Sequence, residues 1–356
     1  MPPPDVELVR EALRTVLFPN FRRDLVTLGM VETVRADGET VYIRLRPGTE
    51  KPEVLQALQA RVDAAVKRVP GVQRVVVECA RAVEGRGRDP FAGRAALPGV
   101  RHVIAVASAK GGVGKSTVAA NLAAALAATG AATGLLDADV YGPSVPLMFG
   151  TSERPRPGPD RTIEPLVRHG VRLVSMGFFL DEQSPVIWRG PIVMGIVRQF
   201  LRDVRWGTLD YLIVDLPPGT GDAALTLAQQ VPLSGAVIVT TPQDVALLDV
   251  GRGIAMFRQL STPVLGVVEN MAGYACPECG AVDLVFGEGG GAALAERFGV
   301  PLLARIPLVA RVREQGDAGV PVVIAAPELP VSATYRALAE RLAADLERVT
   351  DTATAC

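Results

Sequence analysis

The stretch Ala-Lys-Gly-Gly-Val-Gly-Lys-Ser-Thr at residues 109–117 constrains the fold more than any other part of the sequence. An apolar, β-rich run at 102–108 precedes it and an Ala- and Leu-rich run at 116–126 follows, so it joins a predicted strand to a predicted helix. Its glycines allow backbone conformations that side chains oppose, and successive N–H groups can then converge on phosphate oxygens at the positive end of the helix. The stretch therefore predicts a phosphate-binding loop.

Two positions distinguish this loop from the general pattern. Ala109 stands where a glycine is usual, which a negative φ would tolerate, and Lys110 is an extra lysine ahead of the usual Lys115. We expect Lys115 to reach the outer phosphates and Ser116 to bind Mg²⁺, whereas Lys110 would extend to the phosphates of a second copy, so that ATP joins a homodimer. A solvated loop lysine is the alternative for Lys110. The candidate nucleotide-binding residues are Ala109, Lys110, Gly111, Gly112, Val113, Gly114, Lys115, Ser116 and Thr117.

The length of 356 residues and a hydrophobic content of 49% predict two globular domains. We expect a small α+β domain over residues 1–80, a linker rich in Gly, Pro and charge over 81–99, a second domain over 100–350 and a tail over 351–356. Within the small domain the patterns predict helices at 5–17 and 52–68, a hairpin pairing 28–34 with 40–45 around Asp37-Gly38, and a strand at 72–79.

The second domain alternates apolar strands with Ala-rich helices, which is typical of the α/β class. Such alternation predicts a mostly parallel sheet covered by helices, the arrangement of a P-loop NTPase. Ligands of these sheets bind at the carboxyl ends of the strands. The predicted strands after the loop strand are 133–137, 171–176, 209–215, 235–241, 264–269 and 302–306.

Acidic residues follow two of these strands. Asp137 and Asp139 come at the end of the strand 133–137, and we expect both carboxylates to face the nucleotide, one aligning a water of Mg²⁺ and the other the attacking water. Asp215 ends the strand 209–215 and is expected on the magnesium side. The alternative is that these acids only cap ordinary turns.

The segment after the strand 264–269 carries an amide and two thiols. Asn270 is able to pair with the edge of a purine, and Cys276 and Cys279 form one Cys-x-x-Cys, which is half of a four-ligand metal site. Cys79 and Cys356 are isolated in the sequence, so a symmetric dimer that supplies two thiolates from each chain is the simplest completion. The spacing leaves zinc, an iron–sulfur cluster, a redox dithiol and two incidental thiols open.

Charge and hydropathy argue against two classes of partner. The net charge of −1 gives no global field that favours nucleic acid, and no apolar run is long enough for a membrane span. The first residues lack a basic start followed by an apolar segment, and 332–349 mixes Arg with Glu and Asp rather than forming a basic amphipathic helix. We expect a cytoplasmic protein without a nucleic-acid or membrane partner.

These motifs together resemble the Mrp/ApbC family of iron–sulfur cluster carrier ATPases, within the MinD-like group that carries the deviant Walker A loop. Residues 5–79 look like the small iron–sulfur assembly domain that is often fused ahead of this ATPase. The matching stretches are 110–121, 137–144, 188–191, 215–222, 240–249, 269–280, 286–291 and 306–308.

The resemblance implies a function and a role for each motif residue. Lys110 would act in trans, Asp139 would align the attacking water, Asp215 would contact the ligands of Mg²⁺, and Asn270 would contact adenine. Cys276 and Cys279 would bridge a [4Fe–4S] cluster between two chains. The implied activity is slow, switch-like ATP hydrolysis by a homodimer that takes a cluster from an assembly scaffold and passes it to apo iron–sulfur proteins. The alternatives are a ParA/MinD-like partitioning or positioning ATPase and a zinc-stapled dimer.

Overall fold

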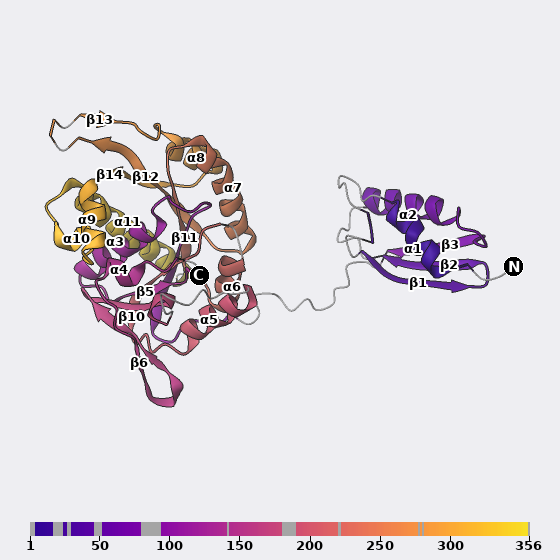
Figure 1. Cartoon of the computed structure of the whole chain (residues 1–356), viewed down its shortest axis with the longest axis horizontal. Coiled ribbons are helices and arrows are strands. Elements are labelled where there is room, and N and C mark those ends of the chain that lie inside the picture. The colour runs from indigo at the N-terminus through magenta and orange to yellow at the C-terminus, as the bar shows by residue number, and fades with distance from the viewer. Residues whose placement is uncertain are drawn as a thin grey trace. The chain divides into compact units, whose positions relative to one another are not determined.

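The chain folds into two compact units, Met1–Pro90 and Phe91–Cys356 (Figure 1). The computed structural model describes residues 4–16, 24–26, 30–45, 52–79, 94–140, 142–179, 190–219, 222–276, 278–279 and 281–354. Most of the expected linker, 81–93, lies outside these residues, as do Arg189, Gly280 and Cys356.

The small unit is a three-stranded sheet covered by two helices. The strands run in the order β1-β2-β3, with β1 and β2 antiparallel around Gly38, whose φ is +59°, and with β2 and β3 parallel. Alternate residues of β2, among them Val41 and Ile43, point into a core that Leu13 and Leu58 of the helices complete. The elements are α1 (Val6–Arg14), β1 (Val31–Asp37), β2 (Thr40–Leu45), α2 (Pro52–Val66) and β3 (Arg74–Cys79).

The large unit alternates strands and helices, as the sequence predicts. Its strands are β4 (Val100–Ala107), β5 (Thr133–Asp137), β6 (Arg156–Pro157), β7 (Ile163–Glu164), β8 (Leu166–Arg168), β9 (Val171–Ser175), β10 (Leu209–Asp215), β11 (Gly235–Thr240), β12 (Val264–Ala275), β13 (Val282–Asp283) and β14 (Leu302–Leu308). Its α-helices are α3 (Lys115–Ala128), α4 (Val145–Met148), α5 (Gly190–Arg202), α6 (Asp222–Gln230), α7 (Asp244–Gln259), α8 (Gly290–Phe298), α9 (Ala310–Asp317), α10 (Val322–Ala325) and α11 (Pro330–Thr354). Short 3₁₀ turns lie at Pro159–Arg161 and Met176–Phe178.

One central sheet organises this unit. Its strand order is β13-β12-β11-β4-β10-β5-β9-β8, and β14 pairs with β12. The neighbours from β12 to β9 are parallel, as is the β12–β14 pair, whereas β13 and β8 are antiparallel. The mostly parallel P-loop NTPase sheet is confirmed. At the carboxyl edge of this sheet, the loop after β4 lies between the ends of β10 and β11.

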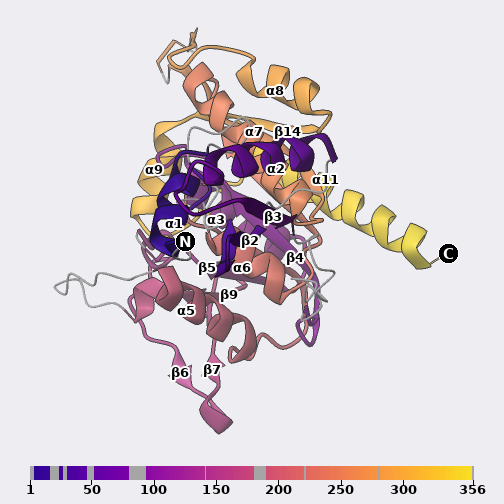
Figure 2. The same ribbon diagram turned by 90° about the vertical axis from the view of Figure 1, so that its right-hand side faces the viewer.

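Helices bury both faces of the sheet (Figures 1 and 2). Ile104 and Val106 of β4 contribute to a core with α3, α10 and α11, while Val103 and Ala105 contribute to the opposite core with α5, α6 and α7. Burial on two faces explains why the central strands are almost continuously apolar.

The structure departs from the sequence prediction at the end of β12. The strand does not stop near Glu269 but continues to Ala275, because Tyr274 and Ala275 pair with Asp283 and Val282 of β13. Figures 1 and 2 show β12 and β13 together at the top of the large unit, and the β6–β7 ribbon at its bottom. Asn270 therefore lies inside a strand, not after one.

The C-terminal helix is longer than expected. α11 continues to Thr354, into residues 351–356 that the sequence assigns to a tail. Within the described part of the chain, no helix is both long and apolar enough to cross a bilayer.

The packing of β5 gives a testable prediction. A Cβ on Gly134 would lie 2.7 Å from Leu209 Cδ1 and 3.1 Å from Trp206 Cζ3, so Gly134→Ala should lower the free energy of unfolding by about 1–3 kcal/mol. Gly195, exposed in α5, has nothing within 4 Å of the same position, and Gly195→Ala should stabilise by about 0.5–1 kcal/mol. Urea unfolding of both variants checks the pair, and equal effects would contradict it.

Candidate functional site

The loop that follows β4 leads directly into α3. Gly112 and Gly114 have φ of +80° and +78°, which only glycine adopts without strain, and Gly114 is the N-cap of α3. Ala109 has no positive φ, so its methyl group is tolerated as expected. The backbone before Lys115 thus turns sharply onto the positive end of a helix of 14 residues.

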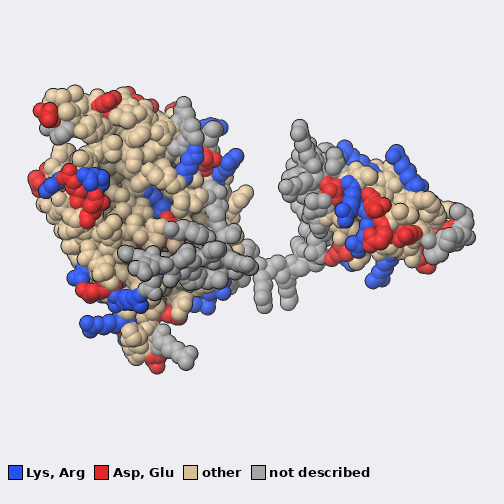
Figure 3. Space-filling view, in the orientation of Figure 1, with Lys and Arg blue, Asp and Glu red and all other residues tan. Residues whose placement is uncertain are grey.

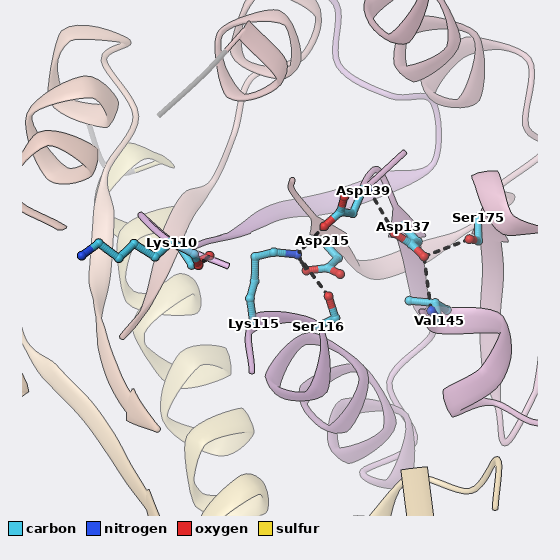
Figure 4. A network of polar contacts seen from close by, with 9 residues as sticks. Lys110, Lys115, Ser116, Asp137, Asp139, Val145, Ser175 and Asp215 are labelled. Carbon is cyan, nitrogen blue, oxygen red and sulfur yellow. Dashed lines mark hydrogen bonds and ion pairs between the residues drawn. The ribbon is translucent and has the colours of Figure 1, made fainter. Parts of the chain in front are cut away.

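Lys115 is buried among acidic side chains (Figure 4). Its Nζ lies 2.5 Å from Asp215 Oδ1, 3.1 Å from Ser116 Oγ and 3.8 Å from Asp139 Oδ2. The Lys115 side chain is 5% exposed and that of Asp215 0%. The structure thus brings together four residues that the sequence analysis had named from three separate segments.

Two carboxylate oxygens in this cluster are buried without a hydrogen-bond partner, namely Asp215 Oδ2 and Asp139 Oδ1. Burial raises the pKa of Asp215, and the Lys115 ammonium partly offsets that rise. Unpartnered buried oxygens are costly, and hard oxygen donors together with the Ser116 hydroxyl suit Mg²⁺ and its water ligands. The residues present fit a magnesium ion.

Asp137 has different surroundings from Asp139, although we expected both to face the nucleotide. Its Oδ1 accepts from the Asp139 backbone N–H at 3.1 Å, and its Oδ2 accepts from the Val145 N–H at 3.2 Å and from Ser175 Oγ at 2.9 Å. Burial, and then the charge of Asp215, raise the pKa of Asp137 to about 7. Asp137 therefore holds the turn that carries Asp139.

Strand pairing brings these distant residues together. β10 lies between β4 and β5, with Asp215 in register with Asp137 and with Val106. Further along, the Gly219 N–H donates to the Ser108 carbonyl at 2.8 Å, and the Ala138 N–H donates to the Asp215 carbonyl at 2.9 Å. The segments after β5 and β10 are thus tied to the phosphate loop.

A pocket of about 220 Å³ opens beside the start of α3. Its lining includes Gly114 and Thr117, Asn270 and Met271, and the Pro307–Val309 segment, and Arg313 and Asp317 are its charged lining residues. Asn270 is 7% exposed, and its Nδ2 donates to the Val113 carbonyl at 2.8 Å. An apolar pocket with a few polar groups next to a phosphate loop has the chemistry of a nucleoside site.

Lys110 points away from Lys115 (Figure 4). Its Nζ lies 3.4 Å from Asp249 Oδ2 on α7, and it is about one third exposed. Asp249 also accepts from Arg252 at 3.0 Å. Because the Lys110 side chain points away, Lys115 is the lysine placed to contact phosphates bound in its own loop.

Cys276 and Cys279 lie at the tip of the β12–β13 ribbon, hereafter the cysteine ribbon (residues 274–276, 278–279 and 281–283). Cys276 is half-buried and Cys279 exposed, and both are free thiols. The backbone N–H groups of Cys279 and then Glu278 lower the pKa of the Cys276 thiol, which favours the thiolate that binds metals. Among the residues described, no group of three or more His, Cys, Asp or Glu is arranged to hold a metal.

Sequence reasoning assigned no role to three side chains that support the site. Ser175 holds Asp137, Asp249 holds Lys110, and Arg305 donates to the fully buried Glu269 at 2.8 Å. Asp249 and Glu269 fall in motif stretches, but a lone residue type carries no information about a partner on another element. Each contact depends on strand or helix packing.

Family models match both units. The model described as "NUBPL iron-transfer P-loop NTPase" matches residues 99–343, and the model described as "Iron-sulfur cluster assembly protein" matches residues 7–78. The first match covers more than half of the chain.

Relatives match over nearly the full length. The chain is 48% identical over 336 residues to a protein named iron-sulfur cluster carrier protein of Deinococcus radiodurans, covering 94% of each chain. It is 40% identical over 340 residues to a protein of the same name from Escherichia coli, covering 95% of this chain and 92% of that one.

Solved structures share the fold of the large unit. A nucleotide-binding protein from Archaeoglobus fulgidus in complex with ADP is 41% identical, with a TM-score of 0.56 over 65% of this chain and 90% of that one. The septum site-determining protein MinD from Pyrococcus horikoshii, with Mg-ADP, is 24% identical, with a TM-score of 0.53 over 68% and 96%, and this likeness concerns the fold alone.

The buried Lys115–Asp215 pair gives a pH-dependent prediction. Lys115→Ala should abolish nucleotide binding and leave Asp215 as an uncompensated buried carboxyl, lowering the free energy of unfolding by about 3–5 kcal/mol near pH 8. The folded carboxyl then binds its proton more tightly than the unfolded one, whose pKa is 3.8, so stability falls as pH rises. Adding Asp215→Asn should remove the contribution of Asp215 to that slope and leave the part that Asp137, whose pKa is raised to about 7, supplies.

Urea unfolding of the single and double variants between about pH 5 and pH 8 measures this. Arg205→Ala, which removes an exposed ion pair with Glu164, is the control and should change stability by less than about 1 kcal/mol. A pH slope as steep in the double variant as in Lys115→Ala would contradict the assignment to Asp215.

Proposed function

The chain belongs to the family of NUBPL iron-transfer P-loop NTPases, and we propose that it is an ATP-hydrolysing carrier that holds a [4Fe–4S] cluster between two copies of itself and delivers it to apo iron–sulfur proteins. One observation carries the proposal. A buried lysine–carboxylate cluster at a phosphate loop and two thiols on a ribbon, one exposed and one half-buried, occur in the same unit. Strand β12 runs from the contact of Asn270 with the loop to these thiols. The lysine–carboxylate cluster is typical of a nucleotide-dependent switch, and the two thiols are half of a metal–thiolate site.

Nucleotide binding rests on the phosphate loop and the neighbouring pocket. The loop backbone and Lys115 hold the phosphates, and the pocket beside Asn270 accepts the nucleoside, with adenine its proposed base. Ser116 and Asp215 hold Mg²⁺ and its waters. When bound, Mg²⁺ neutralises charge on the phosphates and orients them for attack by water.

Hydrolysis requires a positioned water molecule and charge compensation. Asp139 carries a buried oxygen without a protein partner, so it orients the attacking water, and Asp137 keeps Asp139 in place through its backbone N–H. Lys115 stabilises charge on the phosphates from within the chain, and Lys110 does so from the second copy. Turnover is slow because a switch needs two persistent states.

The cluster is cargo for the two thiolates. Cys276 and Cys279 supply two ligands, whereas a four-iron cluster takes four thiolates, so two ribbons meeting across a two-fold axis complete the set. The exposure of Cys279 leaves the site open to the thiolates of a donor or a recipient. Because thiolates must stay reduced, we place this activity in the cytoplasm.

The partitioning or positioning ATPase is the second candidate, since it uses the same loop and both lysines. On the face that Figure 3 shows, Lys and Arg are interspersed with Asp and Glu instead of forming the stripe that DNA binding uses. This candidate also gives no use to the thiols at the ribbon tip. A zinc-stapled dimer would use the thiols but not the acids around Lys115.

Anaerobic reconstitution with iron and sulfide tests the cargo assignment. The wild-type protein should bind roughly one four-iron cluster per dimer, seen in the visible spectrum and by metal analysis. Cys276→Ala should lose the cluster, while Cys79→Ala in the small unit should retain it. Zinc bound in place of iron, or a cluster that survives Cys276→Ala, would contradict the carrier function.

Lys110→Ala separates nucleotide binding from action across the dimer. The variant should bind ATP normally but lose ATP-dependent dimerisation and hydrolyse at least about 100-fold more slowly, because the cation supplied in trans is missing. Arg252→Ala, which removes the other cation on Asp249, is the matched control and should hydrolyse normally. Light scattering and phosphate release are the measurements, and normal turnover by Lys110→Ala would rule out the role in trans.

A further inference from the structure

Strand β12 links a contact with the phosphate loop to the cysteine ribbon. At one end Asn270 Nδ2 donates to the Val113 carbonyl, and a Cβ on Gly114 would overlap the same amide, so the strand packs directly on the loop. At the other end the Cys276 N–H donates to the Ala281 carbonyl at 2.9 Å. A shift of the loop at Asn270 is thus a shift of the segment that carries Cys276.

Between these two contacts lies an irregular segment, hereafter the β12 bulge (Met271–Gly273). From the Asn270–Ile306 pair to the Tyr274–Leu308 pair, β12 advances four residues while β14 advances only two. The residue of β14 opposite the bulge is Pro307, which has no N–H to donate to a ladder. The extra residues of β12 are accommodated where regular pairing is already broken.

The bulge has an unusual backbone. Met271 has a φ of +57°, although it carries a side chain, and Gly273 has a φ of +110°. Left-handed residues other than glycine are disfavoured and are found where the surroundings impose them, often at switches and ligand clamps. Here the surroundings are the loop and the pocket. Met271 lines the nucleoside pocket, and its Cε lies 3.7 Å from where a Cβ of Gly114 would be.

The sheet end of β12 is anchored immediately before the bulge. The fully buried Glu269 accepts from the Gly291 N–H at the start of α8 at 2.5 Å and from Arg305 Nε on β14 at 2.8 Å. A displacement at the bulge is therefore passed forward to the cysteine ribbon, which β14 pairs only at Tyr274 and the short β13 pairs at Tyr274 and Ala275, and not back into the sheet.

We propose that the β12 bulge couples occupancy of the nucleoside pocket to the position of Cys276 and Cys279, with Met271 as the positioning residue. A nucleotide that fills the pocket presses on Met271 and the phosphate loop, and the left-handed backbone at Met271 passes that displacement to the ribbon. The coupling rests on the proposed function, because it supplies the route by which nucleotide state changes how the thiolates hold their cargo.

Thiol labelling of the reduced, metal-free, full-length protein tests the coupling. The rates at which Cys276 and Cys279 react with iodoacetamide are measured by mass spectrometry, at fixed pH, without nucleotide and with saturating Mg-ADP, while light scattering verifies the same oligomeric state. In the wild type, Mg-ADP should change the rate at Cys276 by about fivefold or more.

At Mg-ADP concentrations that saturate the variant, whatever its affinity, Met271→Gly should reduce this response to less than about twofold, because glycine at a positive φ lets the backbone absorb the displacement. Ser261→Gly is the matched control. Ser261 also has a left-handed backbone, with φ of +51°, but lies in the loop before β12, and the response should persist.

A second variant tests the far side of the bulge. Gly273→Ala places a methyl group at a positive φ and 3.2 Å from Val282 Cγ1, away from the pocket, so it should alter the response and leave Mg-ADP affinity unchanged. A wild-type rate that ignores Mg-ADP, or a full response in both Met271→Gly and Gly273→Ala, would overturn the coupling. Because the assay contains no metal, it remains informative if the protein proves not to carry a cluster.

Discussion

The nucleotide site depends on one interaction, the contact of the buried Lys115 ammonium group with the buried carboxylates of Asp215 and Asp139. Removing Lys115 and Asp215 from water is costly, and it is tolerable only because Nζ and Oδ1 are 2.5 Å apart. That distance depends on the loop between β4 and α3, which makes Lys115 the first residue of the helix, and on β10, which lies directly beside β4. Phosphate would compete with the carboxylates for the same ammonium, so the cluster is prepared for an anion and a divalent cation together.

Strand β12 connects the phosphate loop with the thiols, because Asn270 of this strand contacts the loop and Cys276 follows its last residue. Its first part is an inner strand, paired with β11 and β14 and fixed through Glu269. Beyond Tyr274, whose pair with Leu308 is the last with β14, β12 pairs with β13 and leads to the thiols. An inner strand that is fixed in the sheet and ends in a ribbon with few pairing partners suits a protein in which nucleotide binding has to influence a metal site. The β12 bulge, which begins at Met271, separates the inner part of the strand from the part that leads to the thiols.

Most of the large-unit fold was predictable from sequence because burial on both faces makes every central strand a short apolar run. The limits of β5, β10 and β11 agree with the prediction to within a residue or so. β13 could not be predicted, since two residues become a strand only through their partner. The sequence analysis did not predict the extension of β12 for the same reason. The strand continues because it pairs with β13, and not because of its own composition.

The sequence by itself determined the chemistry: a phosphate loop with two lysines, acids at the ends of apolar strands, and one Cys-x-x-Cys. These follow from spacing along the chain, which carries local geometry such as a loop that caps a helix. Only the tertiary structure decided which acid serves which purpose, turning Asp137 toward Ser175 and Asp215 toward Lys115, and pairing Lys110 with Asp249. The reason is physical, because partners separated by many residues are chosen by strand order and register, and those arise from packing the whole sheet.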